Sequence, residues 1–277
     1  MLEKLKQIYR NQIKENINEY DYNNYYYFYK PNSKELFGIE KSISLNEYEL
    51  IKTNYIEKKI YTTNEYNQKI YEYLFENQSY PFSKKAKIIV IDLIDSEFKE
   101  ILKNFFKEVE MITIDNLSVA FCFDSYNLDL NNFQEALTFD LGINFHLHDG
   151  IYINKAVKGE ILLSYLTLIK QHINNSQDEY SDLTTPLFTK NEDLNLSYYQ
   201  IIDEYVISPI LKDVFTKDMI LTYFKNDLNV SKTAKDLYIN RNSLLNKFET
   251  IYKETGLNLQ KFSHACSIYT ILKYQGK

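Results

Sequence analysis

A cluster of amide, hydroxyl and basic side chains near the carboxyl end of the chain has the chemistry needed to contact a nucleic acid. Asn242, Asn246 and Lys253 share one helical face, with Ser243 at its edge. An Asn amide can pair bidentately with an adenine edge, and a Ser hydroxyl can hydrogen-bond to different bases. Basic side chains around this face suit phosphate contacts, which give affinity without sequence preference. The candidate residues are Ser231, Lys232, Lys235, Arg241, Asn242, Ser243, Asn246, Lys247 and Lys253.

Two short helices are predicted to position these side chains. In the first, Val230, Ala234 and Leu237 fall at i, i+4 and i+7 and form one apolar stripe. We expect Ser231 to cap the amino end of this helix, while the small Ala234 lets a second helix cross closely. The segment from Tyr238 to Asn240 breaks the apolar pattern, so the first helix should end there.

The second helix is predicted over residues 241–255, with Asn240 as its N-cap and Gly256 as its stop. Three apolar residues in this helix fall at i, i+4 and i+7. They share one face at about 100° per residue, so this face must pack against a core. The polar candidates therefore lie on the opposite face. The apolar residues are Leu244, Phe248 and Ile251.

Residues 229–259 resemble the C-terminal helix-turn-helix of the purine catabolism and sugar diacid regulators (PucR/CdaR-like), and more distantly the Fis-type helix-turn-helix. The resemblance implies a helical DNA-binding domain of a transcription regulator. The sequence differs from that family at Leu245, Asn246 and Thr250, where basic or aromatic residues are frequent. The matching residues are Asn229, Val230, Ser231, Thr233, Ala234, Leu237, Ile239, Arg241, Asn242, Ser243, Leu244, Lys247, Phe248, Ile251, Thr255, Gly256, Leu257 and Leu259.

Charge is distributed unevenly along the chain. Residues 211–277 hold eleven Lys or Arg and six Asp or Glu, a formal charge of +5. The whole chain carries −6, so the first 210 residues carry −11. A basic module on an acidic body is typical of a nucleic-acid binder whose body does not touch DNA. The alternative is a helical hairpin for protein contact, and the charge asymmetry argues against it.

The composition is typical of a folded chain of two or three domains. Hydrophobic residues make up 44%, and the six Gly and four Pro are too few for long disordered tails. Because no run of 18 apolar residues occurs and the amino terminus lacks a signal-peptide core, we expect no membrane span. Cys122 and Cys266 lie in different predicted domains, so we expect no disulfide and a cytoplasmic location.

The first 80 residues are predicted to form a small α+β unit. Apolar spacing indicates a helix over 2–17, and an aromatic run at 25–30 and the segment 36–43 should form two strands. Helices are expected over 44–56 and 64–77, with Ser44 and Asn64 as caps. The tyrosines of the run could line a ligand pocket, but aromatic side chains on a strand more often pack a core.

Residues 81–175 are predicted to form a second domain with the order β-α-β-β-α-β, which is ferredoxin-like. It resembles the degenerate GGDEF-like domain that precedes the helix-turn-helix in the same regulator families. The hairpin that carries GGDEF in a nucleotide cyclase reads Asp115-Asn116-Leu117-Ser118 here. The glycine pair and the acidic pair are both missing, so we predict no cyclase activity. The strands are expected at 87–93, 111–114, 118–123 and within 143–153, and the helices at 96–109 and 131–141.

His146, His148 and Asp149 could belong to a metal site. The two histidines alternate on a strand and should face the same side. Two nitrogens and a carboxylate could bind zinc if another ligand came from elsewhere. Since no Cys or third His lies at a supporting spacing, we favour ordinary hydrogen bonds and predict no metal.

The remaining segments connect the middle domain to the carboxyl-terminal one. A helix is predicted over 158–173, and the polar residues 174–195 are interpreted as a linker or mobile loop. Pro209 should interrupt a following helix at Ser208, so residues 176–210 form a linker and connecting helix. Residues 211–277 form the all-α helix-turn-helix domain. Its last helix, over 261–273, should turn Phe262, Ala265, Tyr269 and Leu272 inward.

The sequence therefore predicts an α+β protein that regulates transcription by binding double-stranded DNA, expected as a homodimer. The amino-terminal domains would serve dimerisation or sensing, and a small-molecule effector is left open. The alternative is a regulator that acts through protein or small-molecule contacts, with weak or lost DNA binding. We predict no enzymatic activity and no cofactor, because no phosphate-binding glycine loop, nucleophile with partner His or complete metal set occurs.

Overall fold

The computed structural model describes residues 2–10, 12–15, 17, 21, 24–30, 33, 35–59, 61–62, 64–94, 97–125, 130–142, 144–188 and 192–274. Its internal contacts divide the chain into two units, Met1–Lys69 and Ile70–Lys277. The division falls within helix α3 (Glu65–Phe75). The domain boundaries that we place after residues 80, 175 and 210 stay predictions.

Aromatic strands form the core of the first unit. β1 (Ile13–Lys14), β2 (Tyr25–Tyr29) and β3 (Leu36–Glu40) make an antiparallel sheet in the order β1-β3-β2. Phe28 lies opposite Phe37 in the register, and both are fully buried with ring centroids 5.7 Å apart. The aromatic run therefore packs a core here, as aromatic cross-strand pairs usually do.

Two helices flank these strands in the sequence, α1 (Leu2–Ile8) and α2 (Leu45–Lys52). The predicted caps are confirmed, because Ser44 forms a capping box with Glu47 and the Asn64 side chain accepts from the Tyr66 and Asn67 amides. The helix predicted over 2–17 is wrong beyond Ile8. Ile13 pairs with Ile39 as a strand, so its apolar side chain serves the sheet instead of continuing the helical stripe.

The second unit contains a five-stranded sheet in the order β5-β6-β4-β7-β8. The first four strands pair antiparallel throughout. With one helix between β4 and β5 and another between β6 and β7, this is the predicted ferredoxin-like arrangement. The elements are β4 (Ala86–Ile91), α4 (Glu97–Leu102), β5 (Phe106–Ile114), β6 (Leu117–Ser125), α5 (Leu130–Leu141), β7 (Leu147–Ile153) and β8 (Tyr180–Asp182).

Helix α4 is shorter than the predicted helix over 96–109. It ends at Leu102, and Glu108 and Val109 already pair with β6. The helical spacing of apolar residues in this stretch continues by coincidence into a strand whose buried residues include Phe106 and Val109. The hairpin prediction is confirmed, because Asp115 and Asn116 have φ values of 50° and 69°, as a two-residue hairpin turn with two left-handed residues requires.

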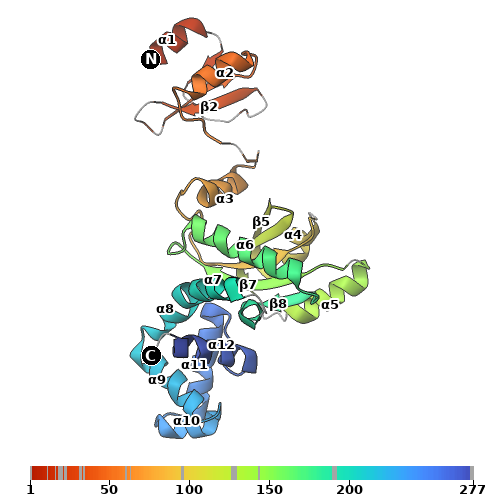
Figure 1. Cartoon of the computed structure of the whole chain (residues 1–277), viewed down its shortest axis with the longest axis vertical. Coiled ribbons are helices and arrows are strands. Elements are labelled where there is room, and N and C mark those ends of the chain that lie inside the picture. Colours follow the sequence, from red (N-terminus) through yellow and green to blue (C-terminus); the bar gives the residue numbers. More distant parts are fainter. Residues whose placement is uncertain are drawn as a thin grey trace. The chain divides into compact units, whose positions relative to one another are not determined.

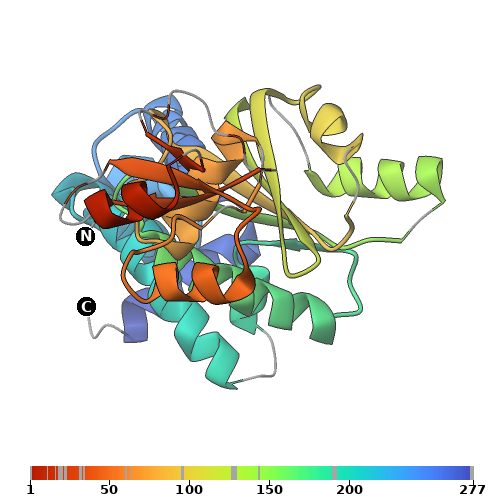
Figure 2. The same cartoon turned by 90° about the horizontal axis from the view of Figure 1, so that it is seen from above.

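The sheet separates two cores (Figures 1 and 2). On one face, Ile89 and Ile91 pack with residues of α4 and α5, such as Phe98 and Phe133. On the other face, Ile88 belongs to a larger cluster that includes residues of α6 (Gly159–Asn175) and α7 (Glu192–Ile202). This second cluster continues without a break into the carboxyl-terminal helices.

The prediction of a linker or loop over 174–195 is wrong for its central part. β8 pairs parallel with β7, and Ser181–Thr184 are buried. A short 3₁₀-helix follows at Thr185–Phe188. The segment reads as a loop because its side chains are polar, but Ser181 and Asp182 find buried hydrogen-bonding partners on other elements.

The expected interruption at Ser208 is also wrong. A π-helical turn, η2 (Asp203–Ile207), joins α7 to α8 (Ser208–Leu211), and Ser208 keeps helical φ and ψ of −56° and −36°. Pro209 lies in the first turn of α8, where a missing N–H costs least. The Ser208 N–H reaches back to the Asp203 carbonyl and its hydroxyl donates to the Asp203 carboxylate at 2.8 Å. Among the described residues, no helix is long and apolar enough to cross a membrane.

Candidate nucleic-acid interface

Four helices build the carboxyl-terminal part of the second unit. α10 and α11 pack on α9 and α12 through a core that includes Met219, Ala234, Leu244 and Phe248. The Tyr223 and Phe248 rings lie 4.7 Å apart between centroids. The bounds are α9 (Val214–Lys225), α10 (Val230–Asp236), α11 (Arg241–Thr255) and α12 (Phe262–Tyr274).

The cap of α10 differs from the prediction. Asn229, not Ser231, is the N-cap, and its side chain accepts from the Lys232 amide at 2.9 Å. Asn is among the strongest N-cap residues, and its position lets Val230 begin the helix. Ser231 consequently lies within the first turn and is exposed, so its hydroxyl is not used as a cap.

The ends of α11 agree with the prediction. The Asn240 side chain accepts from the Asn242 amide at 2.8 Å as the N-cap. Gly256 adopts φ 81° as the C-cap, and its amide donates to the Tyr252 carbonyl at 2.7 Å. The Asn240 side chain therefore fixes the start of the helix, and the left-handed backbone of Gly256 fixes its end.

The turn between α10 and α11 holds an unusual residue that the sequence did not single out. Tyr238 has φ 55°, a left-handed conformation that favours Gly, and its side chain is 96% exposed. The following Ile239 amide donates to the Ala234 carbonyl and closes the end of α10. The backbone thus turns sharply between the two helices at a residue whose ring is exposed to solvent.

All nine candidate residues are exposed, from Ser231 on α10 to Lys253 on α11. The opposite face of α11 is buried at Leu244, Phe248 and Ile251, as the periodicity predicts. We call this set of exposed residues the α10/α11 face. It consists of Ser231, Lys232, Lys235, Arg241, Asn242, Ser243, Asn246, Lys247 and Lys253.

The basic residues of the α10/α11 face are largely uncommitted. In the described part of the chain, Lys232, Lys235 and Arg241 make no ion pair. Lys253 pairs with Glu249 at 3.3 Å, and the Lys247 ammonium lies 5.8 Å from the centroid of the Phe215 ring. An ammonium without a carboxylate partner keeps its charge available for a phosphate.

The carboxyl end of α11 is fixed to the sheet. Lys85, just before β4, donates to the carbonyls of Lys253 and Glu254 at 2.9 Å and 3.3 Å. A cation at a helix carboxyl terminus is favourable because the last carbonyls carry partial negative charge. A Cβ at Gly256 would lie 3.1 Å from both the Lys87 ammonium and the Leu183 side chain, so the close approach also needs this glycine.

A buried carboxylate ties α12 to the same edge of the sheet. Asp182 on β8 accepts from Lys261 at 2.6 Å and from the His264 ring at 3.0 Å. Its second oxygen accepts from the Thr184 amide and hydroxyl. Burial alone would raise the pKa of Asp182, but the hydrogen bonds and charges of His264 and Lys261 outweigh it and hold the pKa far below its usual value.

Comparison with known families identifies this region. Residues 217–274 match the family model of the PucR C-terminal helix-turn-helix domain. This part of the chain is a PucR-type helix-turn-helix domain. No curated protein matches the chain. A solved structure, a regulator of polyketide synthase expression from Bifidobacterium adolescentis, is 13% identical over 78% of this chain and 93% of that chain, with a TM-score of 0.33.

The last helix of the PucR-type domain packs differently from the prediction. Phe262 and Tyr269, expected inward, are 74% and 46% exposed, whereas Ala265 and Leu272 are buried as expected. His264 also lies on the inward face, where its ring reaches Asp182. The buried face of α12 is therefore rotated relative to the apolar stripe that we predicted. Ile268 and Ile271 fill the core positions that we assigned to the aromatic residues.

The two histidines of β7 take part in a buried hydrogen-bond chain. Both His146 and His148 contact the Ser181 hydroxyl, at 2.7 Å and 2.8 Å, so they face the same side as predicted. The second ring nitrogen of His148 lies 2.7 Å from the Tyr165 hydroxyl. Burial lowers the pKa of both histidines.

Asp149 does not join these histidines. It follows His148 on the strand and points to the opposite face, where it pairs with Lys87 at 2.7 Å. Within the described residues, no group of three or more His, Cys, Asp or Glu side chains could hold a metal ion. Cys122 is buried and Cys266 is partly buried, and both are free thiols.

Replacing Tyr238 with Gly is expected to raise the free energy of unfolding by about 0.5–1 kcal/mol, because it relieves a left-handed backbone. Chemical denaturation measures the change. Tyr252→Gly is the matched control, since Tyr252 is a half-exposed residue inside α11 and Gly there should cost about 1 kcal/mol. A destabilised Tyr238→Gly protein would show that the ring makes a stabilising contact.

Asp182→Asn is expected to lower the free energy of unfolding by roughly 3 kcal/mol, because it leaves Lys261 and His264 without their buried anion. The folded pKa of Asp182 is depressed. Its contribution is therefore full above the unfolded pKa of about 3.9 and is lost as pH falls toward the folded pKa. Urea unfolding should show a smaller difference from wild type below about pH 4 than at about pH 5.

Asp115→Asn is the control for this measurement, because Asp115 is 77% exposed and lies 3.8 Å from its Lys170 partner. Exposed pairs of this kind contribute about 0–1 kcal/mol. Equal effects of the two substitutions would contradict the role assigned to Asp182.

Proposed function

We propose that this protein is a transcription regulator that binds duplex DNA through the α10/α11 face. The observation that carries the proposal is the polarity of α11. Leu244, Phe248 and Ile251 are buried, while Arg241, Asn242 and the other polar candidates are exposed within a PucR-type helix-turn-helix domain. We propose that the protein acts in the cytoplasm.

In this proposal α11 enters the major groove with its amino-terminal half. The carboxyl end of α11 is held at the sheet by Lys85, which leaves the amino-terminal half to enter the groove. Asn242 and Asn246 would hydrogen-bond to base edges, with Ser243 beside them. The basic residues and the Ser231 hydroxyl would contact phosphates on either side, which positions the helix without reading sequence.

We also propose that the protein works as a homodimer. A single helix-turn-helix reads few base pairs, and dimeric proteins gain specificity from two half-sites about 34–36 Å apart. The attachment of α11 and α12 to the sheet supports this, since a fixed angle between the two domains lets a dimer hold its reading helices at a defined spacing. The acidic amino-terminal portion would then serve dimerisation or sensing, with no catalytic role.

One observation favours a second candidate function. Between Arg241 and Lys247, the exposed side chains of α11 are uncharged, and the family is often basic there. A regulator that acts mainly through protein or small-molecule contacts would tolerate this change. Such a protein would show no salt-dependent binding to any duplex, whereas a DNA-binding regulator loses affinity steeply as salt rises.

Reversing two charges tests the α10/α11 face. The double variant Lys235→Glu/Arg241→Glu is expected to lower the affinity for mixed-sequence duplex by at least about 100-fold, because it removes two phosphate contacts and adds repulsion. Fluorescence anisotropy at constant salt measures this. The control, Lys103→Glu/Lys158→Glu, makes the same charge change at exposed positions of the sheet domain. Equal losses in both variants would show that net charge alone governs binding.

Single alanine variants separate base contacts from phosphate contacts. Asn242→Ala is expected to relax sequence preference, with a cost of about 1–3 kcal/mol on the preferred duplex and little on others. Lys232→Ala should weaken binding evenly across sequences and lower the salt slope by about 1. Selection from a random duplex library measures the preference. If Asn242→Ala leaves the selected sequence unchanged, this Asn does not read a base.

A further inference from the structure

The turn between α10 and α11 closes with a pattern that normally needs glycine. The Tyr238 amide donates to the Lys235 carbonyl at 3.1 Å, and the Ile239 amide donates to the Ala234 carbonyl at 3.0 Å. These two bonds form a Schellman motif, in which the first residue after the C-cap is left-handed and is usually Gly or Asn. Here that residue is Tyr238, with φ 55°. Its side chain therefore has a steric cost that Gly would avoid.

The Tyr238 side chain contributes nothing to the fold that would offset this cost. It is 96% exposed, the largest exposed fraction among the exposed large hydrophobic side chains of the described residues. Within the same residues, its hydroxyl has no hydrogen-bonding partner. Strained residues of this kind cluster at functional sites. A Tyr with a free ring and a free hydroxyl suits a partner surface that offers both apolar and polar groups.

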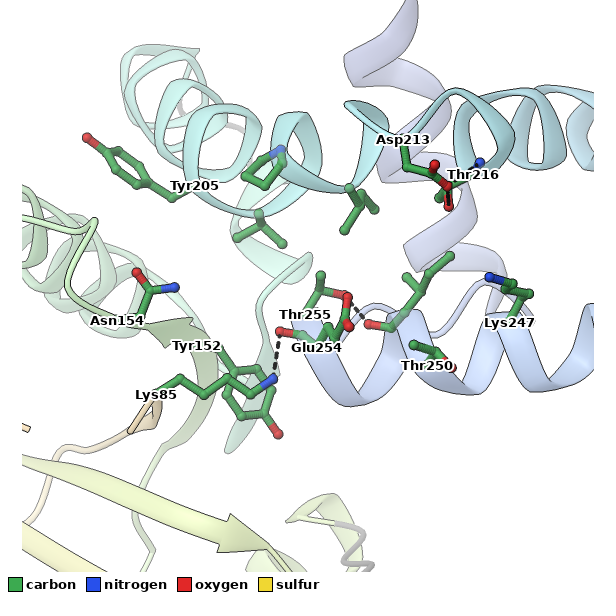
Figure 3. A pocket seen from close by; sticks show the side chains of 14 residues that line it. Lys85, Tyr152, Asn154, Tyr205, Asp213, Thr216, Lys247, Thr250, Glu254 and Thr255 are labelled. Atoms are coloured by element: carbon green, nitrogen blue, oxygen red, sulfur yellow. Dashed lines mark hydrogen bonds between the residues drawn. The ribbon is translucent and has the colours of Figure 1, made fainter. Parts of the chain in front are cut away.

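The turn lies at the end of α11 that is remote from the sheet. Lys85 and Glu254 line a pocket at the carboxyl end of the helix, and Lys247 lies farther along it toward the amino end (Figure 3). Because the fifteen residues of α11 rise by about 1.5 Å each, its amino end lies roughly 20 Å along the axis from the Lys85 contact. Figure 1 shows α10 at the end of the second unit that is farthest from the sheet. Tyr238 therefore lies beside the amino-terminal half of the reading helix.

The surroundings of Tyr238 are basic. Residues 229–248 include four basic residues and one acidic residue, a formal charge of +3. The acidic residue is Asp236, whose carboxylate already accepts from the Asn226 side-chain amide at 2.8 Å. This charge is the complement of an anionic strand, whereas a second copy of the same face would be repelled. The basic residues are Lys232, Lys235, Arg241 and Lys247.

We infer that Tyr238 contacts the sugar–phosphate backbone of the duplex, with its ring against a deoxyribose and its hydroxyl donating to a phosphate oxygen. The inference rests on the proposed function. In helix-turn-helix complexes the amino end of the second helix enters the major groove while the first helix crosses the backbone, so the turn between them lies at the edge of the groove. Tyr hydroxyls are among the groups that bind phosphate oxygens, and such contacts give affinity without sequence preference.

Fluorescence anisotropy with the full chain and a mixed-sequence duplex measures the contact. Tyr238→Phe keeps the ring and removes the hydroxyl, so it should weaken binding at least about threefold, because a hydrogen bond to a charged acceptor is lost. Tyr238→Gly also removes the ring and should weaken binding at least about tenfold, while its thermal stability rises above that of wild type. A variant that is more stable and binds less tightly separates the contact from a folding defect.

Two controls accompany these variants. Tyr269→Phe removes the hydroxyl of a half-exposed tyrosine on α12 and should bind as wild type does. The dependence of affinity on salt distinguishes a neutral contact from an ionic one. Both Tyr238 variants should keep the wild-type salt slope, since a hydroxyl neutralises no phosphate, whereas Lys235→Ala should lower the slope by about 1.

A double-mutant cycle locates the contacted phosphate. Each phosphate of a duplex selected from a random library is replaced in turn by an uncharged methylphosphonate. At the contacted position, this replacement should weaken binding by wild type more than binding by Tyr238→Phe, because the variant has already lost that hydrogen bond. Equal weakening at every position would contradict the phosphate contact.

The outcomes separate the inference from the proposed function. If wild type binds no duplex, the proposed function fails and the contact fails with it. If wild type binds duplex and both Tyr238 variants bind equally well, the proposed function stands and the inference is wrong. A loss of affinity in Tyr238→Gly alone would assign the effect to the backbone of the turn and would also overturn the inference.

Discussion

The attachment of the reading helix to the sheet is the interaction on which the rest of the second unit depends. Two polar contacts make it: the Lys85 ammonium on the last carbonyls of α11, and the Asp182 carboxylate with Lys261 and His264 at the start of α12. In the second contact, Asp182 and His264 are buried groups that would be costly to bury alone. Around them the apolar cluster continues from Ile88 on β4 into Leu244 and Leu257. The helix-turn-helix is therefore packed as part of a larger core.

This packing explains the polarity of the exposed surface. Once Leu244, Phe248 and Ile251 are committed to the shared core, the amides and most of the positive charges of α10 and α11 are left on the outside. The acidic residues that give the body its negative charge lie in the first 210 residues. Because the sheet domain fixes the direction of α11, a structural change at the sheet can alter the direction in which the α10/α11 face points. Neither domain could produce this effect alone.

Features set by local chemistry could be predicted from the sequence. Asn240 and Gly256 bound α11 because a cap acts within a few residues, and the hairpin at Asp115-Asn116 follows from the conformations that these residues tolerate. The buried stripe of α11 follows from periodicity. The β-α-β-β-α-β order of elements along the chain also follows, although the first helix is shorter than predicted and β8 was missed.

Features set by distant partners could not be predicted from the sequence. Polar residues at 180–184 resemble a loop until His146, His148 and His264 supply their hydrogen bonds. The inward turn of His264 explains why Phe262 and Tyr269 are outside, and no local pattern contains that information. At the start of α10 we expected Ser231 as the cap, but the helix begins one residue earlier, at Val230, and Asn229 caps it.

The π-helical turn η2 has a consequence for how the chain can vary in length. Such a turn holds about one residue more than an α-helical turn and still completes one rotation about the helix axis. Deleting one residue between Asp203 and Ile207 would therefore convert the turn to regular α-helix and leave the later helices at nearly the same azimuth. At η2 the chain can lose a residue within a continuous helix without turning the carboxyl-terminal domain.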